Sequence, residues 1–444
     1  MSWITILSGS NVMSLPHIVI VGGGFGGLAA ARVLSDAPVR ITLVDRRNHH
    51  LFQPLLYQVA TAALNPGDIA SPIRRILRRQ ANVEVILGEA ESIDPSAHKV
   101  ILRDGEIAYD YLIIASGATH SYFGHEAWER CAPGLKTVED ALEIRRRVLV
   151  AYEAAEREPD LEIMREWMTF AIVGAGPTGT ELAGALAEIS RHVLARDFRR
   201  IDSKRARIIL IESTPRVLPS MTMESSNSAR RQLEHLGVEV MTSTLVTGID
   251  DRSVTHAGGR IPTRTVIWAA GVAASPLGKS LGAPLDRAGR VIVNPGLSVP
   301  GAPDVFVIGD LASILKSDGK PVPGLAPAAI QEGRHAARNV MHAVQGEPFE
   351  PFHYIDQGTL ATIGRGAAVA EVGRLRLGGF IAWIAWLFIH IFYLIGFRNR
   401  FIVLSEWAWV YLRNESGARL ITGDIEPLLE RGQAGQGKHR MMSS

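Results

Sequence analysis

The sequence predicts an α/β fold in which one strand–turn–helix–strand pattern occurs twice. Short β-branched runs at residues 17–21 and 169–173 lead directly into glycine-rich turns. An Ala- and Leu-rich helical stretch follows each turn, and a second apolar strand then ends in an acidic residue. Such runs are typical of buried parallel strands joined by crossover helices. After residue 370 the chain becomes apolar and rich in Trp, so we expect a third region of a different kind there.

The composition restricts the class of protein. With 444 residues, 47% apolar and 21% charged, the chain is too long for one core and suits two or three globular domains. The net charge of +2 gives no case for nucleic-acid binding. The single cysteine, Cys131, excludes an internal disulfide, a redox dithiol and a cysteine-rich metal site. We interpret it as a buried or loop thiol, and its isolation suits a cytosol-facing location.

The first glycine turn has the spacing of a dinucleotide-binding loop. In this G-x-G-x-x-G pattern, Gly22 permits a tight turn, Gly24 lets a pyrophosphate approach, and Gly27 lets helix and strand pack closely. The helix that follows offers free N–H groups and a positive dipole end to phosphates. Asp45, after the strand at 39–44, is placed to bind a ribose. Candidate cofactor residues here are Gly22, Gly24, Phe25, Gly27, Asp45 and Arg46.

The second turn repeats the pattern with Gly174, Gly176 and Gly179, and the strand at 207–211 ends in Glu212. Glu212 follows the first glycine by 38 residues, and the polar stretch 191–205 explains this long interval as a helix extension or insertion. A carboxylate here repels a 2′-phosphate, which favours NADH over NADPH, although a nearby arginine weakens the preference. Two such Rossmann units predict one resident cofactor and a second nucleotide, and the familiar pair is FAD with NAD(P)H.

From about 18 to 340 the chain resembles the two-dinucleotide-binding-domain flavoprotein superfamily. Residues 112–118 resemble the segment that closes the FAD domain, residues 266–271 its NAD-domain counterpart, and 305–310 the strand that ends in a flavin-binding Gly-Asp pair. The resemblance implies cofactor contacts at Ala115, Gly117, Gly271, Gly309 and Asp310. The lone cysteine separates the chain from dithiol reductases and sulfide:quinone reductases.

Three further segments resemble type II (non-proton-pumping) NADH:quinone oxidoreductases, and the likeness extends from 17 to about 423. They are residues 52–61, 358–364 and 382–390. The first resembles that family's segment near the flavin ring and contains Pro54. The resemblance implies hydride transfer from NADH to FAD and onward transfer of electrons to a membrane quinone. No metal site is predicted, because His49 and His50 have no clustered partners and suit a surface or packing role.

The resemblance also implies two catalytic residues. Glu181 corresponds to the family glutamate where the nicotinamide meets the flavin, and could bind the nicotinamide amide or move protons. The alternative is an acid in the first helical turn that complements the helix dipole. Residues 326–331 align with the family's AQxAxQ quinone motif, in which Pro327 replaces the first Gln. Gln331 would donate to a quinone carbonyl and Ala328 would leave room for the ring; the alternative is an ordinary helix start.

The C-terminal region has two candidate membrane segments. Residues 377–397 contain one clearly polar side chain, His390, and at ~1.5 Å per residue could cross a ~30 Å hydrocarbon core. Residues 398–414 combine a wide apolar arc with a narrow polar stripe, which is typical of a helix lying in the membrane interface. The family resemblance implies peripheral attachment to the cytoplasmic face of the cell membrane. A true span and a homodimer interface are the alternatives.

The predicted domain order follows from these motifs. It comprises an N-terminal extension (1–13), an FAD-binding domain (14–120 and 286–345), a linker with a helix (121–164), an NADH-binding domain (165–285) and a C-terminal membrane-associating or dimer region (346–444). A capping box, Thr137 with Asp140, is predicted to open the linker helix. Two other functions stay open: a soluble NADH:ferredoxin or rubredoxin reductase, and a slow-turnover redox-sensing protein that binds FAD and NAD(H).

Overall fold

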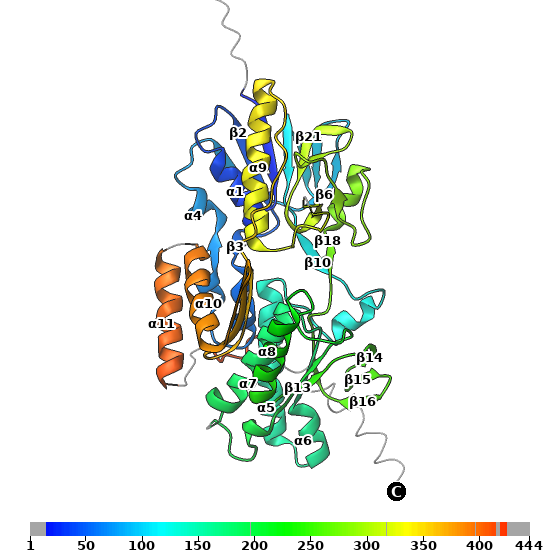
Figure 1. Ribbon diagram of the computed structural model, residues 1–444, viewed down its shortest axis with the longest axis vertical. Coiled ribbons are helices and arrows are strands. Elements are labelled where there is room, and N and C mark those ends of the chain that lie inside the picture. The colour runs from blue at the N-terminus through cyan, green and yellow to red at the C-terminus, as the bar shows by residue number, and fades with distance from the viewer. Residues whose placement is uncertain (1–14, 196, 317, 396, 414–417, 424–444) are drawn as a thin grey trace, which may run out of the picture. The chain divides into compact units, whose positions relative to one another are not determined.

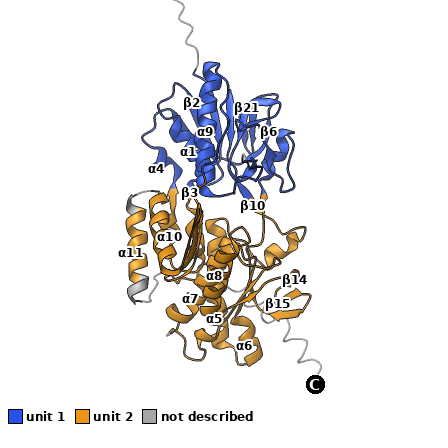
Figure 2. Cartoon of the chain, in the orientation of Figure 1, with its two compact units in different colours: residues 1–50, 72–118, 274–355 blue, residues 51–71, 119–273, 356–444 orange. Residues whose placement is uncertain are grey.

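The computed structural model describes residues 15–195, 197–316, 318–395, 397–413 and 418–423 (Figure 1). The chain divides into two compact units, each assembled from three stretches of sequence (Figure 2). Unit 1 contains residues 1–50, 72–118 and 274–355, and unit 2 contains residues 51–71, 119–273 and 356–444. Four short strands lie where the chain passes from one unit to the other: β3 (His49–Leu51), β4 (Ala70–Pro72), β10 (Ala118–His120) and β18 (Val272–Ala274).

A six-stranded sheet in the order β20-β21-β9-β1-β2-β5 forms the centre of unit 1. All neighbouring pairs are parallel except β20 and β21, which are antiparallel. The predicted run at 17–21 is β1, and all five of its residues are buried, as expected for a central parallel strand. The strand bounds are β1 (His17–Val21), β2 (Arg40–Asp45), β5 (Val83–Leu87), β9 (Tyr111–Ile114), β20 (Ser298–Val299) and β21 (Ala302–Val307).

Two helices of unit 1 pack closely against each other, α1 (Phe25–Val33) and α9 (Ala326–Gln345). A Cβ on Gly333 would overlap the carbonyl of Gly26, so glycine is needed for this approach. The remaining elements are α4 (Ile73–Leu77), a three-stranded antiparallel sheet of β6 (Ala90–Asp94), β7 (Lys99–Leu102) and β8 (Gly105–Ala108), the pair β19 (Val291–Ile292) and β22 (Ala312–Ser313), and the 3-10 turns Pro276–Leu281 and Gly309–Leu311.

Unit 2 repeats the parallel architecture with four strands in the order β13-β12-β11-β17. The linker helix α5 begins where predicted, because Thr137 accepts from the backbone of Asp140 and Asp140 accepts in return. The polar stretch before β12 combines the two predicted alternatives: α7 continues into a π-type turn at Ile189–Val193, and an insertion that contains a short 3-10 turn follows. The main bounds are α5 (Val138–Arg157), α6 (Leu161–Trp167), β11 (Thr169–Val173), α7 (Pro177–Glu188), β12 (Arg207–Ile211), α8 (Met223–His235), β13 (Val238–Met241) and β17 (Thr265–Trp268).

Smaller elements complete the middle of unit 2. An antiparallel sheet contains β14 (Val246–Asp250), β15 (Ser253–His256) and β16 (Gly259–Pro262), and the short helices are α2 (Leu56–Ala60) and α3 (Pro66–Ile69). Single turns of 3-10 helix lie at Gln53–Leu55, Glu126–Arg130 and Ser203–Arg205. Arg145 of α5 holds this region together, since its guanidinium donates to the carbonyls of Val59, Leu64 and Ala418 at 2.8–3.0 Å.

The C-terminal region of unit 2 is an antiparallel sheet followed by two helices. The sheet contains β23 (Thr359–Gly364), β24 (Ala367–Val372) and β25 (Leu375–Gly378), and the helices are α10 (Gly379–Tyr393) and α11 (Phe397–Arg413). Residues 377–397, which the sequence offered as an alternative membrane span, do not form one continuous helix. Leu377 pairs in β25, and the backbone is extended at Leu394, so α10 has only 15 residues. Among the described helices, none combines the length and apolar character needed to cross a membrane.

Candidate active site

In unit 1 the first glycine turn closes tightly against its own sheet. Gly22 has φ +107°, and a Cβ there would overlap the carbonyl oxygen of Ala115. A Cβ on Gly27 would overlap the carbonyl of Gly22. These two glycines are therefore required by the fold itself. Asp45 is fixed to the turn, because its Oδ2 accepts a 2.6 Å hydrogen bond from the backbone N–H of Gly23.

The second turn, in unit 2, reproduces this geometry. Gly174 has φ +101° and lies against the backbone of Ala270, and a Cβ on Gly179 would overlap the Gly174 carbonyl. Oε2 of Glu212 accepts a 2.7 Å hydrogen bond from the backbone N–H of Ala175. The long insertion before β12 therefore leaves Glu212 in the same relation to its loop as Asp45 has to the first loop.

The middle glycines, Gly24 and Gly176, differ from these because the chain does not need them. They are the N-caps of α1 and α7, with φ/ψ of −73°/−163° and −68°/−174°, which any residue adopts. Apart from the residues adjacent in the chain, no atom of the described chain lies within 4 Å of a Cβ built at either position. Open space directly over a helix N-terminus suits the pyrophosphate of a dinucleotide. Both loops therefore fit the FAD and NADH that the sequence predicts.

The other predicted cofactor residues lie on or beside other elements of the two units. In unit 1, Ala115 and Gly117 follow β9, and Gly309, with φ +71°, follows β21 together with Asp310. Phe25 opens α1 and packs edge-on against the ring of His50. Arg46 is exposed and pairs with Glu89 at 3.9 Å. In unit 2, Pro54 lies in the turn before α2, and Gly271 follows β17.

Two residues beside the first loop were not predicted to contribute to it. His50 is buried, and its Nδ1 donates to the carbonyl of Gly23 at 3.1 Å, which confirms a packing role for this histidine. Burial lowers the pKa of His50 to about 4, so the ring is neutral.

Glu332 is also buried and accepts a 2.5 Å hydrogen bond from the backbone N–H of Gly309. Burial raises the pKa of Glu332 to about 7. Only the folded chain reveals these contacts, since both partners are distant in sequence.

A cavity of about 80 Å³, open to solvent at its mouth, lies within unit 2. One wall is a face of α7, where Glu181, Ala185 and Glu188 recur at helical spacing. The facing walls come from α2, β23, α10 and α11 and include the rings of Tyr57, Trp383, Trp386 and Trp407. Trp407 donates to Oε1 of Gln58 at 2.7 Å, which fixes that part of the wall. The cavity combines an acidic wall with flat apolar rings.

Glu181 is perturbed by this environment. Burial raises its pKa to about 8, and a hydrogen bond from the backbone of Thr362 acts in the opposite direction. Glu181 is the fifth residue of α7, and no acid occupies the first turn of that helix. Glu181 therefore lies beyond the first turn, which is where an acid complements the helix dipole. The carboxyl is protonated at neutral pH and can donate.

A second acid lies two turns further along the same face. Glu188 accepts a hydrogen bond from the backbone N–H of Arg365, and burial raises the pKa of Glu188 as well. Gly184 makes this arrangement possible, because any side chain there would overlap the carbonyl of Ile363. Helix α7 and strand β23 therefore touch backbone to backbone between the two acids.

The predicted quinone motif opens α9 in unit 1. Pro327 occupies the first turn of the helix, as expected for an ordinary helix start, and Ala328 is buried. The amide of Gln331 is engaged on both sides. Its Nε2 donates to the carbonyl of Ile355 at 3.0 Å, and its Oε1 accepts from the N–H of Ile355 at 2.9 Å. A quinone would have to compete with the backbone for this side chain.

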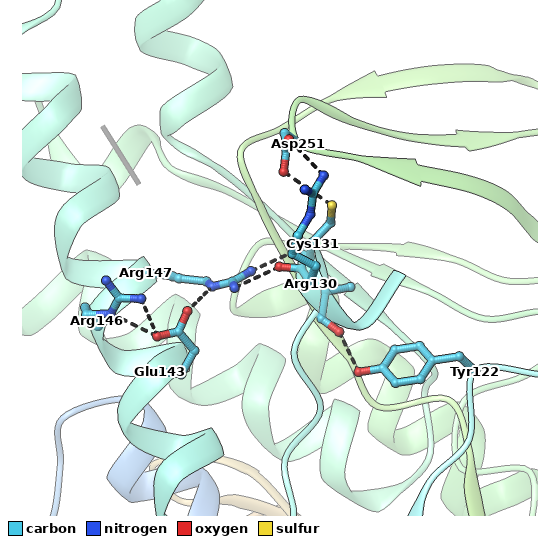
Figure 3. Close-up of polar contacts among 8 residues, drawn as sticks. Tyr122, Arg130, Cys131, Glu143, Arg146, Arg147 and Asp251 are labelled. Carbon is cyan, nitrogen blue, oxygen red and sulfur yellow. Dashed lines mark hydrogen bonds and ion pairs between the residues drawn. The ribbon is translucent and has the colours of Figure 1, made fainter. Parts of the chain in front are cut away.

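Cys131 has the environment of an unreactive thiol (Figure 3). It is half-buried, and its Sγ donates to Oδ1 of Asp251 at 3.3 Å. Burial raises the pKa of Cys131, and the neighbouring carboxylate raises it further. Arg147 donates to the carbonyls of Arg130 and Cys131 at 2.9 Å, which ties this segment to α5. A thiol held in its protonated form is a poor nucleophile.

Comparisons with known proteins decide the family. Residues 16–333 match the pyridine nucleotide-disulphide oxidoreductase family, and residues 357–414 match the NDH2 C-terminal domain. Type II NADH:quinone oxidoreductase NdhA of Mycobacterium tuberculosis is 46% identical over 95% of this chain and 93% of its own length. The chain belongs to the type II NADH:quinone oxidoreductases. A second relative from the same organism, Ndh, is 44% identical over 91% of this chain and 90% of its own length.

Solved structures of more distant relatives support the fold. NDH2 of Plasmodium falciparum in complex with NADH superposes with a TM-score of 0.82, at 21% identity over 92% of this chain and all of that chain. The sulfide:quinone oxidoreductase of Aquifex aeolicus superposes with a TM-score of 0.70, at 22% identity over 90% of this chain and 95% of that chain.

This type II oxidoreductase therefore oxidises NADH and reduces a quinone, with FAD as its bound cofactor and without proton pumping. Bound FAD supplies the two-electron relay between the two substrates. The protein binds both dinucleotides and positions them. The soluble ferredoxin-type reductase and the slow redox sensor, which the sequence left open, are set aside by this assignment.

Proposed function

We propose that Glu181 supplies a proton during quinone reduction and that the cavity beside it admits the quinone ring. The observation that carries this proposal is a carboxyl with a pKa of about 8 on the wall of an aromatic cavity. Reduction of a quinone to a quinol consumes protons as well as electrons, so a neutral acid at the reduction site is useful there. The rings of Trp383 and Trp386 offer flat apolar surfaces for the quinone head group.

The same proposal assigns the remaining site residues. The loops around Gly24 and Gly176 bind FAD and NADH respectively, and Glu212 selects a free ribose diol. We also propose that residues 14–120 and 286–345 form the FAD-binding domain. Residues 165–285 form the NADH-binding domain. A quinone contact at Ala328 and Gln331 stays a prediction.

A quinone-binding role for Gln331 can be separated by experiment from a purely structural role. We expect Gln331→Leu to lower the melting temperature, because both polar groups of Ile355 lose their partner. If Gln331 also binds quinone, the KM for quinone should rise several-fold while the KM for NADH is unchanged. Steady-state kinetics with a water-soluble quinone, alongside thermal unfolding, measure both. An unchanged quinone KM in a destabilised variant would leave Gln331 with the structural role alone.

We further propose that helices α10 and α11 attach the enzyme to the cytoplasmic face of a membrane. Their solvent-exposed residues include large apolar side chains, several of them more than 60% exposed. These residues form the apolar face: Phe380, Ile381, Phe388 and Phe392 on α10, with Phe401, Leu404 and Trp409 on α11. Such a cluster of exposed aromatic side chains marks an interaction surface.

The attachment is tested by removing part of the apolar face. Wild-type enzyme should sediment with membranes, whereas the double variant Phe388→Ser/Phe392→Ser should stay largely in the supernatant with unchanged activity towards a soluble quinone. A matched control, Leu161→Ser/Leu245→Ser, removes two equally exposed apolar side chains elsewhere in unit 2 and should leave sedimentation unchanged. If the first variant instead halves the molecular mass in solution and still binds membranes, the face is a homodimer interface. Everted, but not right-side-out, membrane vesicles should oxidise external NADH.

A further inference from the structure

Four arginines of unit 1 lie on α4 or directly after it. Arg74, Arg75, Arg78 and Arg79 are all exposed, whereas Ile73 and Leu77 of the same helix are buried. The two apolar residues are four positions apart, so they anchor one side of the helical turn. The four guanidinium groups, which we call the arginine cluster, consequently project from the solvent side of a single short segment.

The arginine cluster is not neutralised within the described part of the chain. No hydrogen bond or ion pair there involves any of its four guanidinium groups, whereas neighbouring exposed arginines of the same unit do have acidic partners. Arg46 pairs with Glu89 at 3.9 Å, and Arg103 pairs with Glu89 at 2.6 Å and Glu91 at 3.2 Å. Four guanidinium groups without acidic partners within six residues repel one another. An external anion would offset this repulsion.

The position of the cluster along the chain suggests what that anion is. Helix α11, which carries part of the apolar face, packs on α3, and Asn399 of α11 donates to the hydroxyl of Ser71 at 3.3 Å. The chain reaches Arg74 only three residues after Ser71. The arginine cluster therefore begins three residues beyond a segment that α11 contacts. Guanidinium groups suit phosphate diesters, because their planar donors bind two oxygens at once.

We propose that the arginine cluster binds the anionic headgroups of phospholipids at the membrane surface, an inference that rests on the attachment proposed above. The apolar face supplies the hydrophobic part of the interaction, and the cluster supplies a preference for negatively charged lipid. Each basic residue close to an anionic surface strengthens partitioning roughly fivefold at moderate salt. The four arginines together are enough to decide which lipid composition the enzyme prefers.

Vesicle co-sedimentation of the full-length holoenzyme tests this. The vesicles contain phosphatidylcholine alone, or phosphatidylcholine with about a third phosphatidylglycerol. Wild-type enzyme should partition at least tenfold more strongly into the anionic vesicles, and high salt should reduce this preference by screening. The variant R74Q/R75Q/R78Q/R79Q should bind both compositions equally and no more weakly than wild type binds the neutral vesicles. Its matched control, R74K/R75K/R78K/R79K, retains the charge and should keep most of the preference.

The experiment separates failure of the lipid assignment from failure of the membrane attachment. Both variants should oxidise NADH with a soluble quinone at the wild-type rate, which shows that they are folded and loaded with FAD. Equal partitioning of wild type into both vesicle types, or a preference that survives in the Gln variant, would overturn the lipid assignment and leave attachment through the apolar face intact. Absence of binding to either vesicle would overturn the attachment and this inference with it.

Discussion

Gly176→Val should lose NADH affinity while keeping both its fold and its flavin. The backbone of Gly176 is extended, and the space around its Cβ position is open, so the chain accepts a larger residue there. The dinucleotide does not, because its pyrophosphate must approach the N-terminus of α7 at this point. We expect the KM for NADH to rise at least ~100-fold, equivalent to about 3 kcal/mol of binding.

The measurement combines steady-state NADH titration with the flavin absorbance of the purified variant. Gly105→Val provides a control in unit 1, since its Cβ position is equally open and it lies on a short antiparallel strand. That variant should behave as wild type. Gly179→Val should instead reduce the yield of folded protein, because a side chain there collides with the Gly174 carbonyl. A Gly176→Val enzyme with normal NADH affinity would remove the reason for placing NADH on this loop.

Glu181→Gln should lower quinone-dependent turnover roughly 100-fold, at the lower end of the range for a lost general acid. Glutamine preserves the size and polarity of the side chain. Its amide does not ionise, however, so it cannot act as a general acid. The rate at which NADH bleaches the flavin absorbance should be unchanged, because that half of the reaction does not use the proton. If instead the KM for NADH rises, Glu181 binds the nicotinamide amide and the proton comes from elsewhere.

The pH dependence gives an independent readout. Below a pKa of about 8 the Glu181 carboxyl carries its proton, and as pH rises through that value the proton is lost. Quinone reduction by wild type should therefore decline on the alkaline side, and the decline should be absent from the Gln variant. The free energy of unfolding should also fall as pH rises. Folding raises this pKa from 4.5, so wild type loses stability as pH rises from about 4.5 to 8 relative to the variant.

Much of the nucleotide-binding architecture was predictable from sequence, because it depends on local rules. Gly22 and Gly174 are needed at φ values that other residues avoid, and the buried strands at 17–21 and 169–173 are continuous apolar runs. Glu212 has the same relation to its loop as Asp45 despite its unusual spacing, as the pattern of an acid at the end of the second strand indicated. The capping box at Thr137 is equally local.

The tertiary structure alone decided the remaining features. The apolar stretch 377–397 has the composition of one long helix, yet its first two residues pair with a neighbouring strand, and hydrogen bonding across a sheet is invisible to periodicity. The raised pKa of Glu181 arises from its burial, and the cavity that surrounds it is lined by residues such as Trp383 and Trp407 from distant segments of the chain. Spacing along the chain determined where a dinucleotide can bind. Burial, which depends on contacts between distant segments, determined which acids hold a proton.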